Sequence, residues 1–140
     1  MKLASKYAPV ADYAQTLRKE VALTADALPG RMSISHLHWG GGTPTALSPD
    51  HLEMLMDEVR AHWDFADDAE IAIESDPRTL TAEMAARIGQ LGFTRASFGV
   101  QEFDIKVQKA INRIQPPAMV RKSVDQLRAA GVSAINFLIS

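Results

Sequence analysis

The chain has 140 residues, which is the size of one domain or of a part of one. Hydrophobic residues make up 46% of it, which suffices for a buried core; the net charge of −2 excludes a basic nucleic-acid-binding surface, and no apolar run is long enough to span a membrane. Cysteine is absent, which excludes disulfides, thiolate nucleophiles and any metal cluster held by cysteines of these residues.

Strand patterns and helix patterns alternate along the chain. The first residues, 1–5, lack the apolar core of a signal peptide, which predicts a cytoplasmic protein. Apolar residues at three- and four-residue steps mark amphipathic helices, and short apolar runs bounded by turn residues mark strands. Asp67 and Asp68 are predicted to form a turn. The predicted helices cover 10–28, 48–63, 81–91, 104–111 and 119–130, and the predicted strands cover 35–39, 70–75, 95–101 and 133–139.

This order of elements predicts an α/β fold built from parallel βα units. The chain opens directly with a helix and stops inside a strand. Four parallel strands normally need helices beyond both ends, or closure into a barrel. We therefore expect residues 1–140 to be a single fragment of an α/β barrel, with about four strands and their flanking helices.

Three consecutive glycines, Gly40–Gly42, follow the first predicted strand and precede Thr43-Pro44-Thr45. Glycine accepts positive φ and exposes its N–H groups to a ligand, so the turn is interpreted as a ligand contact; the alternative is a tight turn that touches nothing. The sequence is not a P-loop, because no Gly-Lys-Ser/Thr follows. Ser48 and Pro49 then begin the next helix as cap and first helical residue.

Glu74 and Gln101 are predicted to lie at the carboxyl ends of the second and third strands. Alternation places both on the small, polar face of the sheet, because Ile71, Ile73 and Phe98 occupy the other face. Parallel α/β folds bind ligands at this edge, where the glycine turn also lies. Taken singly, Glu74 could be a surface acid and Gln101 a satisfied polar residue at a strand end; together they predict a site for a nucleoside-like or amino-acid-like ligand.

Three further polar residues have two interpretations each. Arg113 follows the short fourth helix and either pairs with a ligand carboxylate or lies solvated at the helix end. His36 and His38 share one face of a strand and could bind zinc, but the sequence places no third ligand near them. They are therefore interpreted as polar residues inside the barrel.

Several motifs together resemble one enzyme family. The sequence closely resembles the oxygen-independent coproporphyrinogen III oxidases, which are radical S-adenosylmethionine (SAM) enzymes of haem biosynthesis with a partial TIM barrel. The haem-chaperone-like radical SAM proteins are the second-ranked resemblance, and a non-catalytic α/β nucleoside-binding module is a further alternative. The motifs that carry the resemblance are His38–Thr45, Glu74–Pro77, Gly99–Asp104, Val107–Gln108 and Ile111–Gln115.

The resemblance implies a reaction and its cofactors. Such enzymes use a [4Fe-4S] cluster and an electron donor to cleave SAM to a 5′-deoxyadenosyl radical. They decarboxylate two propionates of coproporphyrinogen III to vinyl groups, giving protoporphyrinogen IX. Which residues are catalytic stays unknown; from composition we expect no metal ligand in these residues and no nucleic-acid or membrane partner. The resemblance implies SAM contacts at Gly41, Gly42, Thr43, Glu74, Gln101 and Arg113, the first three at the amino-acid end of SAM.

The chain departs from the family in two places. The cysteine motif that binds the cluster lies in the family just upstream of where this chain begins, and an aspartate of the last strand is replaced by Leu138 or lost in a one-residue gap. We therefore expect the 140 residues alone to be inactive, because without thiolates there is no cluster. Open sheet edges also predict self-association of the chain.

Overall fold

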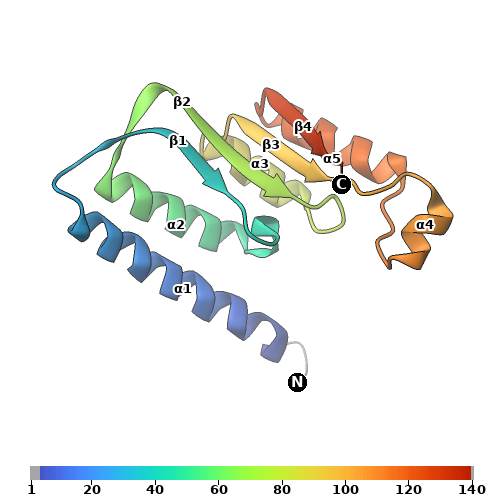
Figure 1. Cartoon of the computed structure of the whole chain (residues 1–140), viewed down its shortest axis with the longest axis horizontal. Helices are drawn as coiled ribbons and strands as arrows, with labels where there is room; N and C mark the ends of the chain where they lie inside the picture. The colour runs from blue at the N-terminus through green and yellow to red at the C-terminus, as the bar shows by residue number, and fades with distance from the viewer. Residues whose placement is uncertain (1–3, 140) are drawn as a thin grey trace. The chain divides into compact units, whose positions relative to one another are not determined.

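The structure, a computed structural model, describes residues 4–139 (Figure 1). The chain forms two compact units. The first runs to Ser35 and includes Leu47–Ala69; the second consists of His36–Ala46 and the chain from Glu70 onward. The helices are α1 (Ala4–Ala27), η1 (Pro44–Ala46, a 3-10 turn), α2 (Pro49–His62), α3 (Ala82–Gln90), α4 (Ile105–Ala110) and α5 (Pro117–Ala129), and the strands are β1 (Ser33–Trp39), β2 (Asp64–Ser75), β3 (Arg95–Gly99) and β4 (Ala134–Leu138).

The first unit is built on the pair of helices α1 and α2, which pack against each other. α2 begins as predicted, with the Ser48 side chain accepting a hydrogen bond from the backbone N–H of His51 at 3.1 Å. Arg18 of α1 reaches Glu58 of α2 at 2.8 Å. Among the described residues, no helix combines the length and the apolar character needed to cross a membrane.

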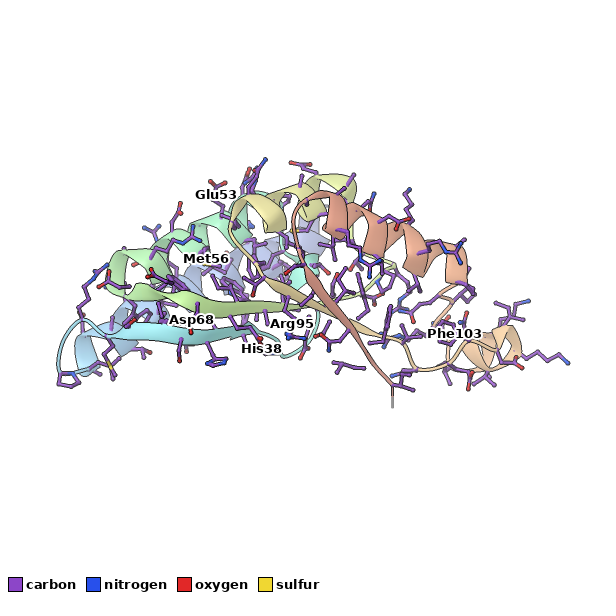
Figure 2. All side chains as sticks on the ribbon, turned by 90° about the horizontal axis from the view of Figure 1, so that it is seen from above. His38, Glu53, Met56, Asp68, Arg95 and Phe103 are labelled. Carbon is purple, nitrogen blue, oxygen red and sulfur yellow. The ribbon has the colours of Figure 1, made fainter. Side chains whose placement is uncertain are left out.

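The second unit contains the ends of β1 and β2 together with β3 and β4, in the sheet order β1-β2-β3-β4 (Figure 1). β2 and β3 pair in parallel, as do β3 and β4. α3 and α5 cover one face of this sheet (Figures 1 and 2). The core between them is apolar, and its fully buried members include Ile73, Ile88, Ala96, Phe98 and Leu127. The predicted α/β fold with parallel strands is thus confirmed.

Close packing of α3 against α5 depends on a glycine. Gly89 lies in the last turn of α3, next to Ala130 after the end of α5. A Cβ added at Gly89 would overlap the carbonyl oxygen of Ala130. The two helices can therefore approach this closely only because position 89 has no side chain.

Several predicted boundaries are wrong. α1 begins at Ala4 rather than at 10, because apolar spacing marks only the part of a helix that packs. Asp67 and Asp68 belong to the long strand β2 instead of a turn; both are exposed, so strand pairing outweighs their low β propensity. β3 ends at Gly99, which leaves Gln101 in the following loop.

The predicted apolar face is also incomplete at the last strand. β4 ends at Leu138 rather than at Ile139. Phe137 stacks on Phe98 with ring centroids 6.2 Å apart, but it stays largely exposed, as does Ile139. Helices therefore bury the apolar face of β2 and β3 but not that of β4.

Candidate functional site

A row of polar side chains crosses the sheet of the second unit. The strand registers place Glu74 of β2 opposite Ser97 of β3, and Ser97 opposite Asn136 of β4. His38 of β1 is 3.0 Å from Glu74, measured from Nε2 to Oε1, and the Ser97 hydroxyl donates to Asn136 Oδ1 at 3.0 Å. Figure 2 shows His38 on the side of the strands opposite α3 and α5. The polar face predicted from alternation is therefore present.

A second polar row lies one step nearer the start of the strands. Arg95 (Figure 2) pairs with Glu70 at 3.3 Å and donates to Asn136 Oδ1 at 3.4 Å. The positive charge of this arginine is thus balanced by a neighbouring carboxylate on the same face.

The glycine turn packs directly against the first polar row. A Cβ added at Gly40 would lie 2.7 Å from His38 Nε2 and 2.9 Å from Glu74 Oε1, so a side chain there would displace the imidazole or the carboxylate. Gly41 and Gly42 have φ values of +81° and +111°, which residues other than glycine rarely adopt. The space around both glycines is open. The turn and the carboxylate, predicted to converge, are therefore neighbours.

Arg113 lies at the carboxyl end of β3. Its Nη2 donates to the carbonyl oxygen of Gly99 at 2.9 Å, and its Nε is buried without a partner among the described residues. Asn112 has a positive φ of 53° and turns the chain after α4, so that the N–H of Arg113 reaches Gln108 at 2.8 Å. The interpretation of Arg113 as a solvated residue at a helix end is wrong, because the side chain folds back onto the strand.

Gln101 is placed differently from Glu74. It lies exposed, two residues beyond the end of β3, in the loop that leads through Phe103 (Figure 2) to α4. The prediction that Gln101 belongs to the polar face of the third strand is therefore wrong, because β3 ends two residues before it.

Sequence reasoning missed a buried polar network beneath this edge. Gln115 donates through Nε2 to Asp76 Oδ1 at 3.2 Å and to the Gly99 carbonyl at 3.3 Å. Gln108 donates to the carbonyl oxygens of Glu102 at 2.7 Å and Gln115 at 3.1 Å, and accepts from the Gln115 N–H at 2.9 Å. Both glutamines are only 1% exposed. No periodicity marks them, because glutamine in a helix or loop is usually solvated.

Asp76 is the charged member of that network. Burial alone raises the pKa of its carboxyl, but hydrogen bonds from the side chain and backbone of Arg78, with a smaller one from Gln115, outweigh this and lower the pKa below its ordinary value. The shortest contact joins Arg78 Nη2 to Asp76 Oδ2 at 2.7 Å. Asp76 is therefore held as a carboxylate and cannot act as a proton donor near neutral pH.

Residues 8–139 match the radical SAM superfamily. The chain belongs to the radical SAM superfamily. The oxygen-independent coproporphyrinogen III oxidase of Bradyrhizobium diazoefficiens is 48% identical over 128 residues, 91% of this chain and 28% of that protein. The corresponding protein of Helicobacter pylori is 43% identical over 126 residues, 89% of this chain and 28% of that protein. The solved radical SAM enzyme coproporphyrinogen III oxidase (HemN) of Escherichia coli is 36% identical with a TM-score of 0.84, covering 92% of this chain and 30% of that one.

These findings confirm the resemblance and the partial radical SAM barrel that the motifs predicted. The chain spans less than a third of the length of each of these radical SAM relatives. The 140 residues contain no cysteine, and the described residues bring no three histidine, aspartate or glutamate side chains together as metal ligands. A cluster held by thiolates therefore does not fit within these residues, whereas the glycine turn, Glu74 and the unpartnered Arg113 Nε fit a polar organic ligand.

Proposed function

We propose that this chain forms the SAM-binding part of a cytoplasmic radical SAM oxidoreductase of the coproporphyrinogen III oxidase type. Its whole reaction is the oxidative decarboxylation of two propionates of coproporphyrinogen III to vinyl groups. The names and identities of the relatives support this substrate. A [4Fe-4S] cluster and an electron donor belong to the proposal as well, and the thiolates for the cluster would have to come from outside these 140 residues.

The proposed SAM contacts follow from the chemistry of each group. N–H groups of Gly41 and Gly42, with Thr43 beside them, suit the carboxylate at the amino-acid end of SAM. Glu74 suits the ammonium group or the ribose hydroxyl pair, because a carboxylate only accepts hydrogen bonds. Gln101 and Arg113 are the remaining proposed contacts, and the unpartnered Nε of the arginine is a donor that a ligand carboxylate would satisfy.

The observation that carries the proposal is the contact between Gly40 and the pair of His38 and Glu74. This contact brings the exposed backbone of Gly41 and Gly42 beside the Glu74 carboxylate. The His38 imidazole, 3.0 Å away, orients that carboxylate. Bound SAM would supply the 5′-deoxyadenosyl radical chemistry of the superfamily. The residues of this chain would bind and orient SAM, and none of them is proposed to react.

Calorimetric titration of SAM into the purified chain tests the proposal. We expect saturable binding that the Glu74→Ala variant weakens at least about tenfold, since a hydrogen bond to a charged group contributes about 1.5–3 kcal/mol. Glu83→Ala is the matched control, because Glu83 is an exposed acid in the first turn of α3 and the variant makes the same change in charge. Absence of binding by a folded chain at millimolar SAM, or equal binding by Glu74→Ala, would contradict the proposal.

A further inference from the structure

We propose that Asp76 and Gln115 are positioning residues that hold three loops in the single arrangement that SAM binding requires. The inference rests on the proposed function and assigns roles to residues outside the predicted contacts. The three loops follow β1, β2 and β3 and cover residues 40–46, 76–81 and 100–116, the last including the short helix α4. They carry or closely follow all six proposed contacts.

The hydrogen bond between Gln115 and Asp76 joins the loop after β3 to the loop after β2. Gln115 and Arg113 donate to the same carbonyl oxygen of Gly99, so the position of the glutamine also fixes where the arginine lies. All these atoms belong to the second unit. A change at the Asp76 carboxylate is therefore transmitted to Arg113 through one side chain.

A second set of contacts joins the loop after β2 to the glycine turn. The backbone carbonyl of Asp76 accepts hydrogen bonds from the Thr79 N–H at 3.0 Å and from its hydroxyl at 3.2 Å. The Thr79 hydroxyl is in turn 3.2 Å from that of Thr45, which is buried in the turn η1. Asp76 thus connects through Thr79 to the segment that directly follows Gly41 and Gly42.

Beyond Val100, which is buried at its start, the loop after β3 depends on polar contacts. Its large apolar side chains Phe103, Ile105 and Val107 are each more than 40% exposed. The side chains that it buries after Val100 are the amides of Gln108 and Gln115. A buried polar network stabilises one arrangement only when every member is satisfied, so losing one bond releases its neighbours as well. The positions of Gln101 and Arg113 are therefore set by these amides.

Replacing the amide of Gln115 by a carboxyl makes the network depend on pH. In Gln115→Glu the new carboxyl faces the Asp76 carboxylate, with Arg78 and Arg113 as the nearby cations. When protonated, its single O–H can replace the amide as donor to Asp76 but cannot also donate to Gly99; its ionised form repels the Asp76 carboxylate, and burial raises its pKa. We expect the SAM dissociation constant to rise about tenfold at about pH 8 and to stay near the wild-type value at about pH 5. Gln90→Glu, an exposed position at the end of α3, is the control and should leave affinity unchanged at both pH values.

A second variant separates positioning from simple loss of stability. In Asp76→Asn/Gln115→Glu the new amide at position 76 can donate to the new carboxylate, so we expect most of the affinity lost at about pH 8 to return. Equal SAM binding by Gln115→Glu and wild type at both pH values would overturn the inference. So would a loss that is independent of pH and not restored in the double variant.

Hydrogen exchange without SAM distinguishes this inference from the proposed function. Protection factors of amides in residues 40–46 should fall in Gln115→Glu at about pH 8, although position 115 does not touch that loop. Unchanged protection there would overturn the inference, whether or not SAM binds. Failure of the wild-type chain to bind SAM would contradict the proposed function but leave this coupling of loops measurable.

Discussion

At the scale of single residues, two opposing effects set the pKa of Asp76: burial raises it, and the contacts with Arg78 lower it. The aspartate side chain is 8% exposed and the arginine 37%, so the cation lies at the surface and the anion beneath it. Arg78 donates to both carboxylate oxygens and also through its backbone N–H. Because these bonds outweigh burial, the folded chain holds the pKa of Asp76 below the value of an unfolded chain.

This balance predicts how Arg78→Ala changes stability with pH. A carboxyl whose folded pKa is lowered stabilises the fold above its unfolded pKa, and this contribution disappears as pH falls through the folded pKa. Without the Arg78 side chain, only the backbone N–H of residue 78 and the Gln115 amide oppose burial, so the pKa of Asp76 rises and the ionised carboxylate stabilises the variant less near neutral pH. We expect the free energy of unfolding to fall by about 1–3 kcal/mol at neutral pH. The deficit should shrink as pH falls below about 4, through the lowered folded pKa of Asp76 in the wild type.

Urea unfolding at several pH values measures this effect. Arg121→Ala is the control, because Arg121 is exposed on α5 and its loss makes the same change in charge. We expect the control to change the free energy of unfolding by less than about 0.5 kcal/mol. A deficit in Arg78→Ala that persists undiminished in acid would show that the charge of Asp76 is not its cause.

At the scale of elements, local sequence patterns predicted the face of the sheet on which a residue lies better than the residue at which a strand ends. Alternation has a period of two, so it placed Glu74 and Ser97 on one face wherever the strand runs straight. The end of β3 could not be predicted, because it depends on contacts distant in sequence. Gln115 donates hydrogen bonds to Gly99, 16 residues earlier in the sequence, and to Asp76, 39 residues earlier. Neither contact leaves a periodic pattern in the sequence.

The candidate site was also predicted only in part. Motif resemblance and strand order predicted that the glycine turn and Glu74 meet, and the packing at Gly40 agrees. The fold of Arg113 back onto Gly99 could not be deduced, because it requires Asn112 in a left-handed conformation. Asparagine tolerates that conformation but does not demand it, so the residue alone does not predict the turn.

The contact between α3 and α5 gives a prediction at this scale. In Gly89→Ala the new methyl group meets the Ala130 carbonyl, which is backbone and cannot rotate away. Alanine raises helix propensity by about 1 kcal/mol, but overpacking costs about 1–3 kcal/mol and the helices must separate. We therefore expect a net loss of stability, measured as a lower urea midpoint with little change in slope.

Gln90→Ala controls for helix propensity in that experiment. Gln90 is exposed and follows Gly89 directly, so the variant raises propensity without a clash. Its stability should equal or slightly exceed that of the wild type. Equal stability of Gly89→Ala and Gln90→Ala would contradict the tight contact described for α3 and α5.

At the scale of the whole molecule, the open edge of the sheet at β4 is where we expect copies of the chain to pair. β4 lies at one end of the strand order, and in residues 4–139 it pairs with β3 alone. Phe137, Leu138 and Ile139 are exposed, the last to 76%. An open edge with apolar side chains on both faces is a template for pairing with another chain. The predicted self-association should therefore occur through this strand.

Light scattering after size-exclusion chromatography tests that prediction with Ile139→Lys. We expect the average mass of the wild-type chain to rise with concentration, and the lysine variant to remain nearer the monomer, because a charge directly after the end of the edge strand opposes pairing. Ile105→Lys makes the same change at an exposed apolar position of α4 and should associate like the wild type. If both lysine variants weaken association equally, exposed apolar surface in general drives it; if the wild type stays monomeric at all concentrations, the open edge does not pair.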